Sequence, residues 1–575
     1  MINGTFLMIG TLSEFISTSG TLTISGNFSR EDGTFTHNSG TIVFNSAEED
    51  RTINYGSPIT TTPIFYNLQF DGGGKWTLQS ELRTAANLTI TNGTLDVSAN
   101  NYPMRISGQW TNNGTFIAQN GTVTLYESTN LLIDKSLKSG GSSFYRLILF
   151  GSGNSWTLQD DLDVNQNLTI TAGQLIASNH DINVGGNWSA TGTFSMGTGK
   201  VTFDGPAIGK TIRSGSSAFA DVEFDVVDGS WTLLDTLDIN GNLTITNGTL
   251  DVTGSNYAVN VAGNWSNAGT FNARQGTVTF DGTGTGKTIT PGASAFYNLT
   301  FSGSGGWGLQ KTIDINGNVT LTNGTLDAVS EENTIYVGGN WLATGATFTH
   351  RNNTVIFDGT SSSTITSGGQ SFGSVIFDHS GTTWTLQDPF VVSRNLILEA
   401  GTLDIKASLN WPITVGGSWE NNGGTFVSRS GTVTLNTSQP AQQIKANGNS
   451  FNNLTFSGSG GWALSGVLDV DGNFNLGSGT LNVASADNTI YVGGNWISSG
   501  TFMADSGTVE LNATSAGKVI SSGTNSFHKI IFNGPGAVWT LQDVLISNDD
   551  LFLTIGTLNA NGQGITVGGN WTRTD

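Results

Sequence analysis

Hydrophobic and polar residues alternate over short stretches of this chain. In the segment 242–252, every second position is apolar within two runs, N-L-T-I-T and T-L-D-V. A period of two places alternate side chains on opposite faces of a β-strand. Asn247 and Gly248 separate the runs, where a turn requires a backbone conformation that Asn and Gly adopt easily. The pattern predicts two short strands joined by a turn.

Similar runs of three to six residues, bounded by Gly, Asn and Asp, fill the rest of the chain. No stretch of useful length has the 3.6-residue period of an amphipathic helix. Short strands with turn residues between them, and nothing helical, are typical of an all-β protein.

Tryptophans recur at a nearly constant distance. Seven open a W-x-L segment at spacings of 75 to 80 residues, and seven others lie in G-N-W or a close variant, with Phe28 as an earlier member of that series. Only Trp411 stands outside the two series. Because each buried aromatic removes a large apolar area from water, we expect these tryptophans to form the core. They are Trp76, Trp110, Trp156, Trp188, Trp231, Trp265, Trp307, Trp341, Trp384, Trp419, Trp462, Trp496, Trp539 and Trp571.

The repeat defines the predicted domain organisation, which is one continuous β-solenoid over 1–575. F-x-x-L-x-F and G-T-F segments recur with the same period as the tryptophans. An irregular first unit covers about 1–64. The repeat units that follow cover about 65–143, 144–218, 219–295, 296–371, 372–450, 451–526 and, in part, 527–575.

A shorter internal similarity favours a solenoid over a string of β-sandwiches. The segment N-L-T-I-T-N-G-T-L at Asn242 resembles G-N-W-x-N-x-G-T-F at Asn264, 22 residues later. That offset suits one turn of a parallel β-helix, whereas a sandwich needs about seven longer strands per ~100 residues. The predicted fold is a single-stranded parallel β-helix with about three coils per unit and about 21 coils in total.

The repeated motifs resemble those of a known group of proteins. The motifs are V-A-G-N-W at 261–265, G-T-V-T-F-D-G at 276–282 and N-G-T-L-D at 247–251. They are similar to the filamentous-haemagglutinin-like, adhesin-type repeat regions of large secreted bacterial and archaeal surface proteins. The resemblance implies a right-handed parallel β-helix serving in a stalk, fibre, adhesin or matrix.

Composition and charge exclude several classes of protein. The chain has 22 basic and 43 acidic residues, a net charge of −21, and no cysteine. A nucleic-acid partner needs Lys and Arg to neutralise phosphates, so we expect none. Disulfides and thiol chemistry are excluded, and no apolar run approaches the ~18 residues of a transmembrane segment. An acidic, cysteine-free chain rich in Gly, Thr and Asn is more usual outside cells, so the predicted location is extracellular or at the cell surface.

The acidic residues follow the repeat instead of gathering once, as a polysaccharide-cleaving site would require. We therefore predict that the chain is not an enzyme, with no catalytic residue, and that these acids stabilise turns. Calcium is the alternative ligand for them, but the nonapeptide of calcium β-rolls is absent. No metal or cofactor is predicted. The acids lie in L-D at Asp96, Asp251, Asp327 and Asp404, and in F-D-G at Asp204, Asp281 and Asp358.

The favoured function is structural: an extracellular protein that forms or contributes to a surface fibre, sheath or stalk. The expected partner is another copy of the chain, bound head to tail or laterally. The head-to-tail expectation rests on the ends, because the motif at 568–572 stops where other units continue into N-x-G-T-F, and 2–6 resembles that continuation. The alternative is an adhesin that binds glycans, and an enzyme acting on polysaccharide is less favoured.

Overall fold

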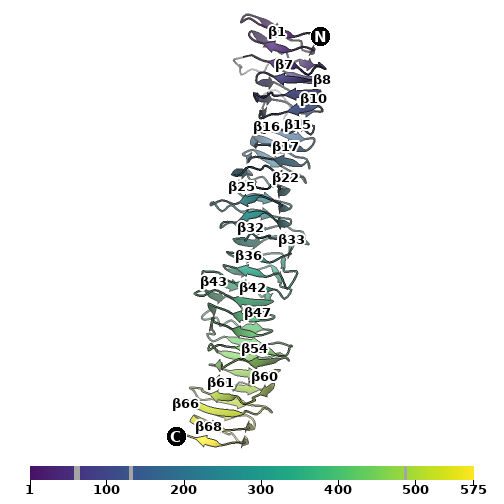
Figure 1. The fold of residues 1–575 in the computed structure, drawn as a ribbon. Coiled ribbons are helices and arrows are strands. Elements are labelled where there is room, and N and C mark those ends of the chain that lie inside the picture. The colour runs from purple at the N-terminus through teal and green to yellow at the C-terminus, as the bar shows by residue number, and fades with distance from the viewer. Residues whose placement is uncertain (57–64, 128–133, 485–487, 575) are drawn as a thin grey trace. The chain divides into compact units, whose positions relative to one another are not determined.

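The computed structural model describes residues 1–56, 65–127, 134–484 and 488–574. Over those ranges it contains seventy strands, from β1 (Phe6–Met8) to β70 (Trp571–Arg573), and no helix. Within each of its compact parts, the strands follow one another in chain order (Figure 1) and pair in parallel with strands one turn away. The predicted class, an all-β parallel solenoid, is confirmed, with about 26 turns.

The chain forms two compact units. The first consists of Met1–Gly282 with Thr290–Ser294, and the second of Thr283–Ile289 with Ala295–Asp575. The expectation of one continuous solenoid over 1–575 stays a prediction, because it concerns how these two units join.

One column of ten strands shows how the first unit is built. Each strand pairs in parallel with the strand one turn further along the chain. Apolar side chains at paired positions therefore stack inside the column. Its strands are β9 (Leu82–Thr84), β11 (Met104–Ile106), β14 (Thr122–Tyr126), β16 (Arg146–Leu158), β18 (Leu168–Ile176), β20 (Trp188–Ala190), β23 (Lys210–Arg213), β25 (Ser230–Leu233), β28 (Thr249–Asp251) and β31 (Thr270–Asn272).

The second unit contains a column of the same kind, again with each strand paired to the strand one turn further along. Both columns pass through the same ten motifs in the same order, from the L-R-T strand (β9) or the I-D-I strand (β36) to the G-T-F strand. The strands of the second column are β36 (Ile313–Ile315), β39 (Ile335–Val337), β42 (Thr354–Phe357), β45 (Ser374–Phe377), β48 (Leu396–Leu398), β51 (Trp419–Asn421), β54 (Gln442–Lys445), β57 (Gly461–Leu464), β60 (Thr480–Asn482) and β63 (Thr501–Met503).

The sequence repeat is not a whole number of turns. Three strands make one turn, because β37 (Val319–Leu321) and β38 (Thr325–Asp327) lie between β36 and its neighbour β39. Each repeat holds eleven strand positions. Ten of them are the motifs of the two columns, and the eleventh is the first Phe of F-x-x-L-x-F, which forms a parallel β-bridge with the next turn, for example Phe296 with Ile315. A repeat therefore covers three and two-thirds turns. The predicted three coils per unit and 21 coils in total are wrong for this reason, although the 22-residue offset is a true turn.

As a result, equivalent strands of consecutive repeats lie in different columns. In the second unit the strands that match the L-D-V motif are β36, β47 (Phe390–Val392) and β58 (Leu468–Val470), and each belongs to a separate column. A surface feature that recurs once per repeat therefore points in a different direction in each of three consecutive repeats.

Candidate functional site

The predicted core tryptophans are almost all inside the solenoid. Thirteen of the fourteen are at most 1% exposed. The exception is Trp571, which is 50% exposed because it lies on β70 and no described residue packs over it. The placement of Trp571 in the core therefore stays a prediction.

Lysine side chains lie against several of the W-x-L tryptophans, a feature that sequence reasoning missed. The Nζ atoms of Lys135 and Lys210 lie 4.9 and 3.9 Å from the ring centroids of Trp156 and Trp231, each one turn further along the chain. Lys210 Nζ also donates to the carbonyl of Gly205. A cation held over an indole ring and bonded to loop carbonyls fastens the loop to the core. The recurrence of K-T-I at 210–212 and 287–289 was the signal that could have found it.

Burial makes these lysines easier to deprotonate. Loss of hydration lowers the pKa of Lys135 and of Lys210 from 10.5 to about 8. Between those two pH values the unfolded chain binds more protons than the folded chain. The linkage relation then requires that the free energy of unfolding increases as the pH rises through this interval.

We expect the thermal unfolding temperature of the first unit to rise between pH 8 and pH 10, and Lys210→Gln to reduce that rise. Glutamine is compatible with this position, because Gln442 is paired with Trp462 in the same way as Lys210 is with Trp231. Unfolding followed by circular dichroism at several pH values measures the effect. Lys311→Gln, at an exposed position, is the control. An identical pH dependence in the wild type and in Lys210→Gln would contradict this assignment.

The acids of the L-D motif are engaged in local contacts. Arg274 Nη2 lies 2.6 Å from Asp251 Oδ2, one turn away, and Arg351 bonds Asp327 in the same way at 2.9 Å. Each carboxylate also accepts a hydrogen bond from the backbone two residues later, at Thr253 in the first case. The arginines hold the pKa of both carboxyls below the ordinary value. These contacts fit a turn-stabilising role.

The acids of the F-D-G motif have a different environment. Burial raises the pKa of Asp204. Burial and the nearby charge of Asp314 raise the pKa of Asp358. Over the described parts of the chain, no group of three or more His, Cys, Asp or Glu side chains could hold a metal ion.

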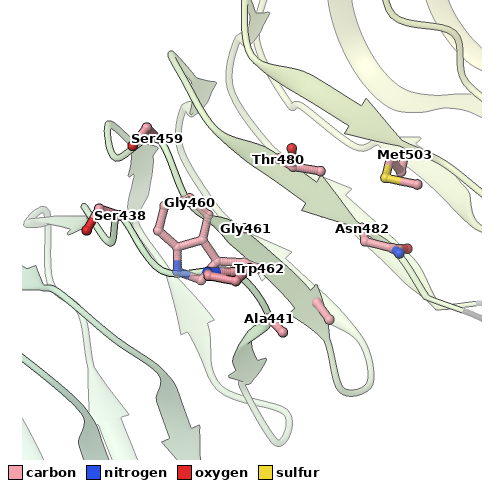
Figure 2. A pocket seen from close by; sticks show the side chains of 11 residues that line it. Ser438, Ala441, Ser459, Gly460, Gly461, Trp462, Thr480, Asn482 and Met503 are labelled. Atoms are coloured by element: carbon pink, nitrogen blue, oxygen red, sulfur yellow. The ribbon is translucent and has the colours of Figure 1, made fainter.

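An open groove of about 480 Å³ crosses β57, β60 and β63 in the second unit. Figure 2 shows Trp462 between Ser459 on one side and the strands that carry Asn482 and Met503 on the other. Trp462 is itself buried, so small residues such as Ala463 form much of the open surface. None of the eleven lining residues is Asp, Glu, Lys, Arg or His. The groove can therefore bind through apolar contact and neutral hydrogen-bonding groups.

The groove interrupts the repeat. The residue that follows the W-x-L tryptophan is Thr in five repeats, but it is Ala463 here. In the repeat 296–371 the same place is Gly308, and Val329 covers it: a Cβ added to Gly308 would lie 2.9 Å from Val329 Cγ2. The residue equivalent to Val329 is Ala484, which is too short to cover Ala463 in this way. Gln442 in place of lysine also removes a charge. The five threonines are Thr77, Thr157, Thr232, Thr385 and Thr540.

Comparison with known proteins does not assign the chain to a family. No family model, curated protein or solved structure matches it. A search of the described residues for a helix long and apolar enough to cross a membrane finds none. The fold is that of a β-helix repeat protein, whereas the likeness to adhesin-type surface proteins rests on the sequence motifs alone.

Proposed function

We propose that the chain is an extracellular structural protein that forms or contributes to a surface fibre, sheath or stalk, and that its copies associate end to end. The parallel stacking of short strands, in which each strand pairs with the strand one turn further along, carries the proposal. A free strand edge is a template for pairing with another chain. A head-to-tail contact of this kind does not close on itself, so it produces a filament.

At the N-terminal end, β1 pairs only with β4 (Phe28–Arg30) among the described strands. Phe6 N–H donates to the carbonyl of Asn27, and Met8 C=O accepts from Glu31 N–H. Because alternate residues of a parallel strand bond to the same neighbour, the amide of Leu7 points away from β4. Leu12, which follows β1, is 99% exposed, so this part of the first unit presents apolar surface.

At the C-terminal end, β70 pairs only with β68 (Leu551–Asn559) in the described chain. The carbonyl of Asn570 accepts from Leu551 N–H, and Thr574 N–H donates to Leu553 C=O. The same alternation directs the backbone of Trp571 away from β68. Its half-exposed ring supplies apolar area there.

The pairing of Phe6 corrects one part of the sequence argument. Phe6 is paired with Phe28, the early member of the G-N-W series. It therefore holds the place of the N-L-x-I strand, one turn before G-N-W, instead of the place of the G-T-F strand. Successive copies would bring unlike motifs together at the junction, and the contact depends on backbone pairing and apolar area.

We expect Leu7→Pro to reduce end-to-end association, because proline removes the N–H that faces away from β4 and could pair with another copy. Leu7→Thr, which keeps that N–H, is the matched control. Electron microscopy and light scattering of the purified chain over a range of concentrations measure particle length and mass. The proposal requires end-to-end particles in the wild type and fewer in Leu7→Pro. Monodisperse monomers of wild type at high concentration would refute it.

A further inference from the structure

We infer that the groove over Trp462 binds an uncharged oligosaccharide. The inference does not depend on end-to-end association. It rests on three properties of the groove, namely its lack of charge, its shape and its neutral hydrogen-bonding groups.

The lack of charge selects the class of ligand. The chain carries 22 basic and 43 acidic residues, a net charge of −21, yet the lining of this groove contains none of them. Desolvating an ionised group against such a surface costs free energy that no opposite charge returns. Anionic and cationic ligands are therefore disfavoured relative to neutral ones.

The shape of the groove suits flat, partly apolar rings. Its volume of about 480 Å³ lies within the usual range of small-ligand sites, about 300–1,000 Å³. Ala441, Ala463 and the exposed Met503 provide apolar surface within the groove. The C–H face of a sugar ring can pack on such a surface and displace water from it.

Neutral hydrogen-bonding groups border this apolar surface. Thr480 and Asn482 lie on β60, and Ser438 and Ser459 lie on the opposite side (Figure 2). Asn482 Oδ1 accepts from Ala484 N–H at 2.6 Å, which fixes the amide plane. The Nδ2 group of an amide is a double donor, and hydroxyls both donate and accept, as the hydroxyl groups of a sugar require. The groove therefore combines the two kinds of contact that a neutral glycan makes.

The test uses the purified full chain with neutral and acidic sugars. The neutral probes are lactose, cellobiose and N,N′-diacetylchitobiose, and a glucuronate-containing disaccharide is the acidic probe. Saturation-transfer NMR and calorimetry measure binding. Ala463→Thr and Ala484→Val place in the groove the side chains that other repeats carry at the same positions. Each should weaken binding about tenfold or more, as added methyl groups do in a fitted site. Gly308→Ala, at the matching place of another repeat, should leave binding unchanged.

Binding of at least one neutral probe, lost in both filling variants and retained in Gly308→Ala, supports the inference. The inference is overturned if no neutral probe binds, if the acidic probe binds as tightly, or if the filling variants bind as the wild type does. A change in self-association alone in Ala463→Thr would also overturn it, since the occupant would then be another copy of the chain. Normal thermal unfolding of each variant ensures that lost binding is not lost folding.

Discussion

Trp496→Ala is expected to destabilise the second unit by about 3–5 kcal/mol, the usual cost of removing a large buried aromatic. The indole ring is stacked on Phe474 with centroids 4.3 Å apart and an interplanar angle of 14°. It also lies 5.1 Å from the rings of Phe502 and Phe527. Alanine would leave a cavity among three aromatic rings. Denaturant unfolding followed by circular dichroism measures the loss.

The next residue in the strand is the control. Ile497 is 39% exposed, so Ile497→Ala should cost less than about 1 kcal/mol. Trp496→Phe should fall between the two variants. It replaces the indole with a smaller ring, but it also removes a buried indole N–H that has no described acceptor. Equal stability of Trp496→Ala and Ile497→Ala would contradict the role of this residue as core.

Gly359→Ala is expected to destabilise the second unit by about 1–3 kcal/mol, the range for forced overpacking. A Cβ at Gly359 would lie 1.8 Å from the carbonyl oxygen of Gly338, one turn earlier. The obstacle is backbone, so it cannot rotate away as a side chain would. The F-D-G glycine is thus required by the close approach of successive turns.

Gly306→Ala is the matched control for this change, because the nearest atom to its added Cβ is 3.8 Å away. We expect its unfolding midpoint to stay near that of the wild type. Hydrogen exchange of the amides near Gly338 adds a local measure, and faster exchange there in Gly359→Ala is the expected result. Unchanged exchange together with an unchanged midpoint would show that the turns separate without cost.

The fold class could be predicted because its cause is local. Alternation in segments such as 242–252 determines which side chains point inward, and Asn247-Gly248 marks where a strand ends. The recurrence of Trp at one spacing then implies stacked, equivalent environments. Each of these signals lies within a few residues or repeats at a fixed distance.

The number of turns could not be obtained in the same way. The offset between Asn242 and Asn264 is the number of residues in one particular turn. The number of residues between paired strands differs from turn to turn along the second-unit column. The variation comes from turns of different length between short strands. Strands such as β43 (Ser363–Thr366) carry weak alternation, so the sequence pattern does not mark them as separate strand positions.

The groove illustrates a different limit. The changes that open it, Ala463 and Ala484 among them, are visible as departures from the repeat. Their effect depends on which residues lie above one another, and that requires the register. The contact of Lys210 with Trp231 was missed for the same reason, since a whole turn of the chain separates the two residues.

The mismatch between repeat and turn constrains how such a chain can change in length. Within the second unit, loss or duplication of one whole repeat would leave every strand above its usual neighbour, because the order of the eleven motifs is unbroken. Everything beyond the change would, however, be rotated by one third of a turn. Loss of a single turn would keep the orientation but bring unlike motifs into contact. Gene-level expansion is therefore structurally easy in steps of one repeat, and it preserves the direction of a distal binding surface only in steps of three.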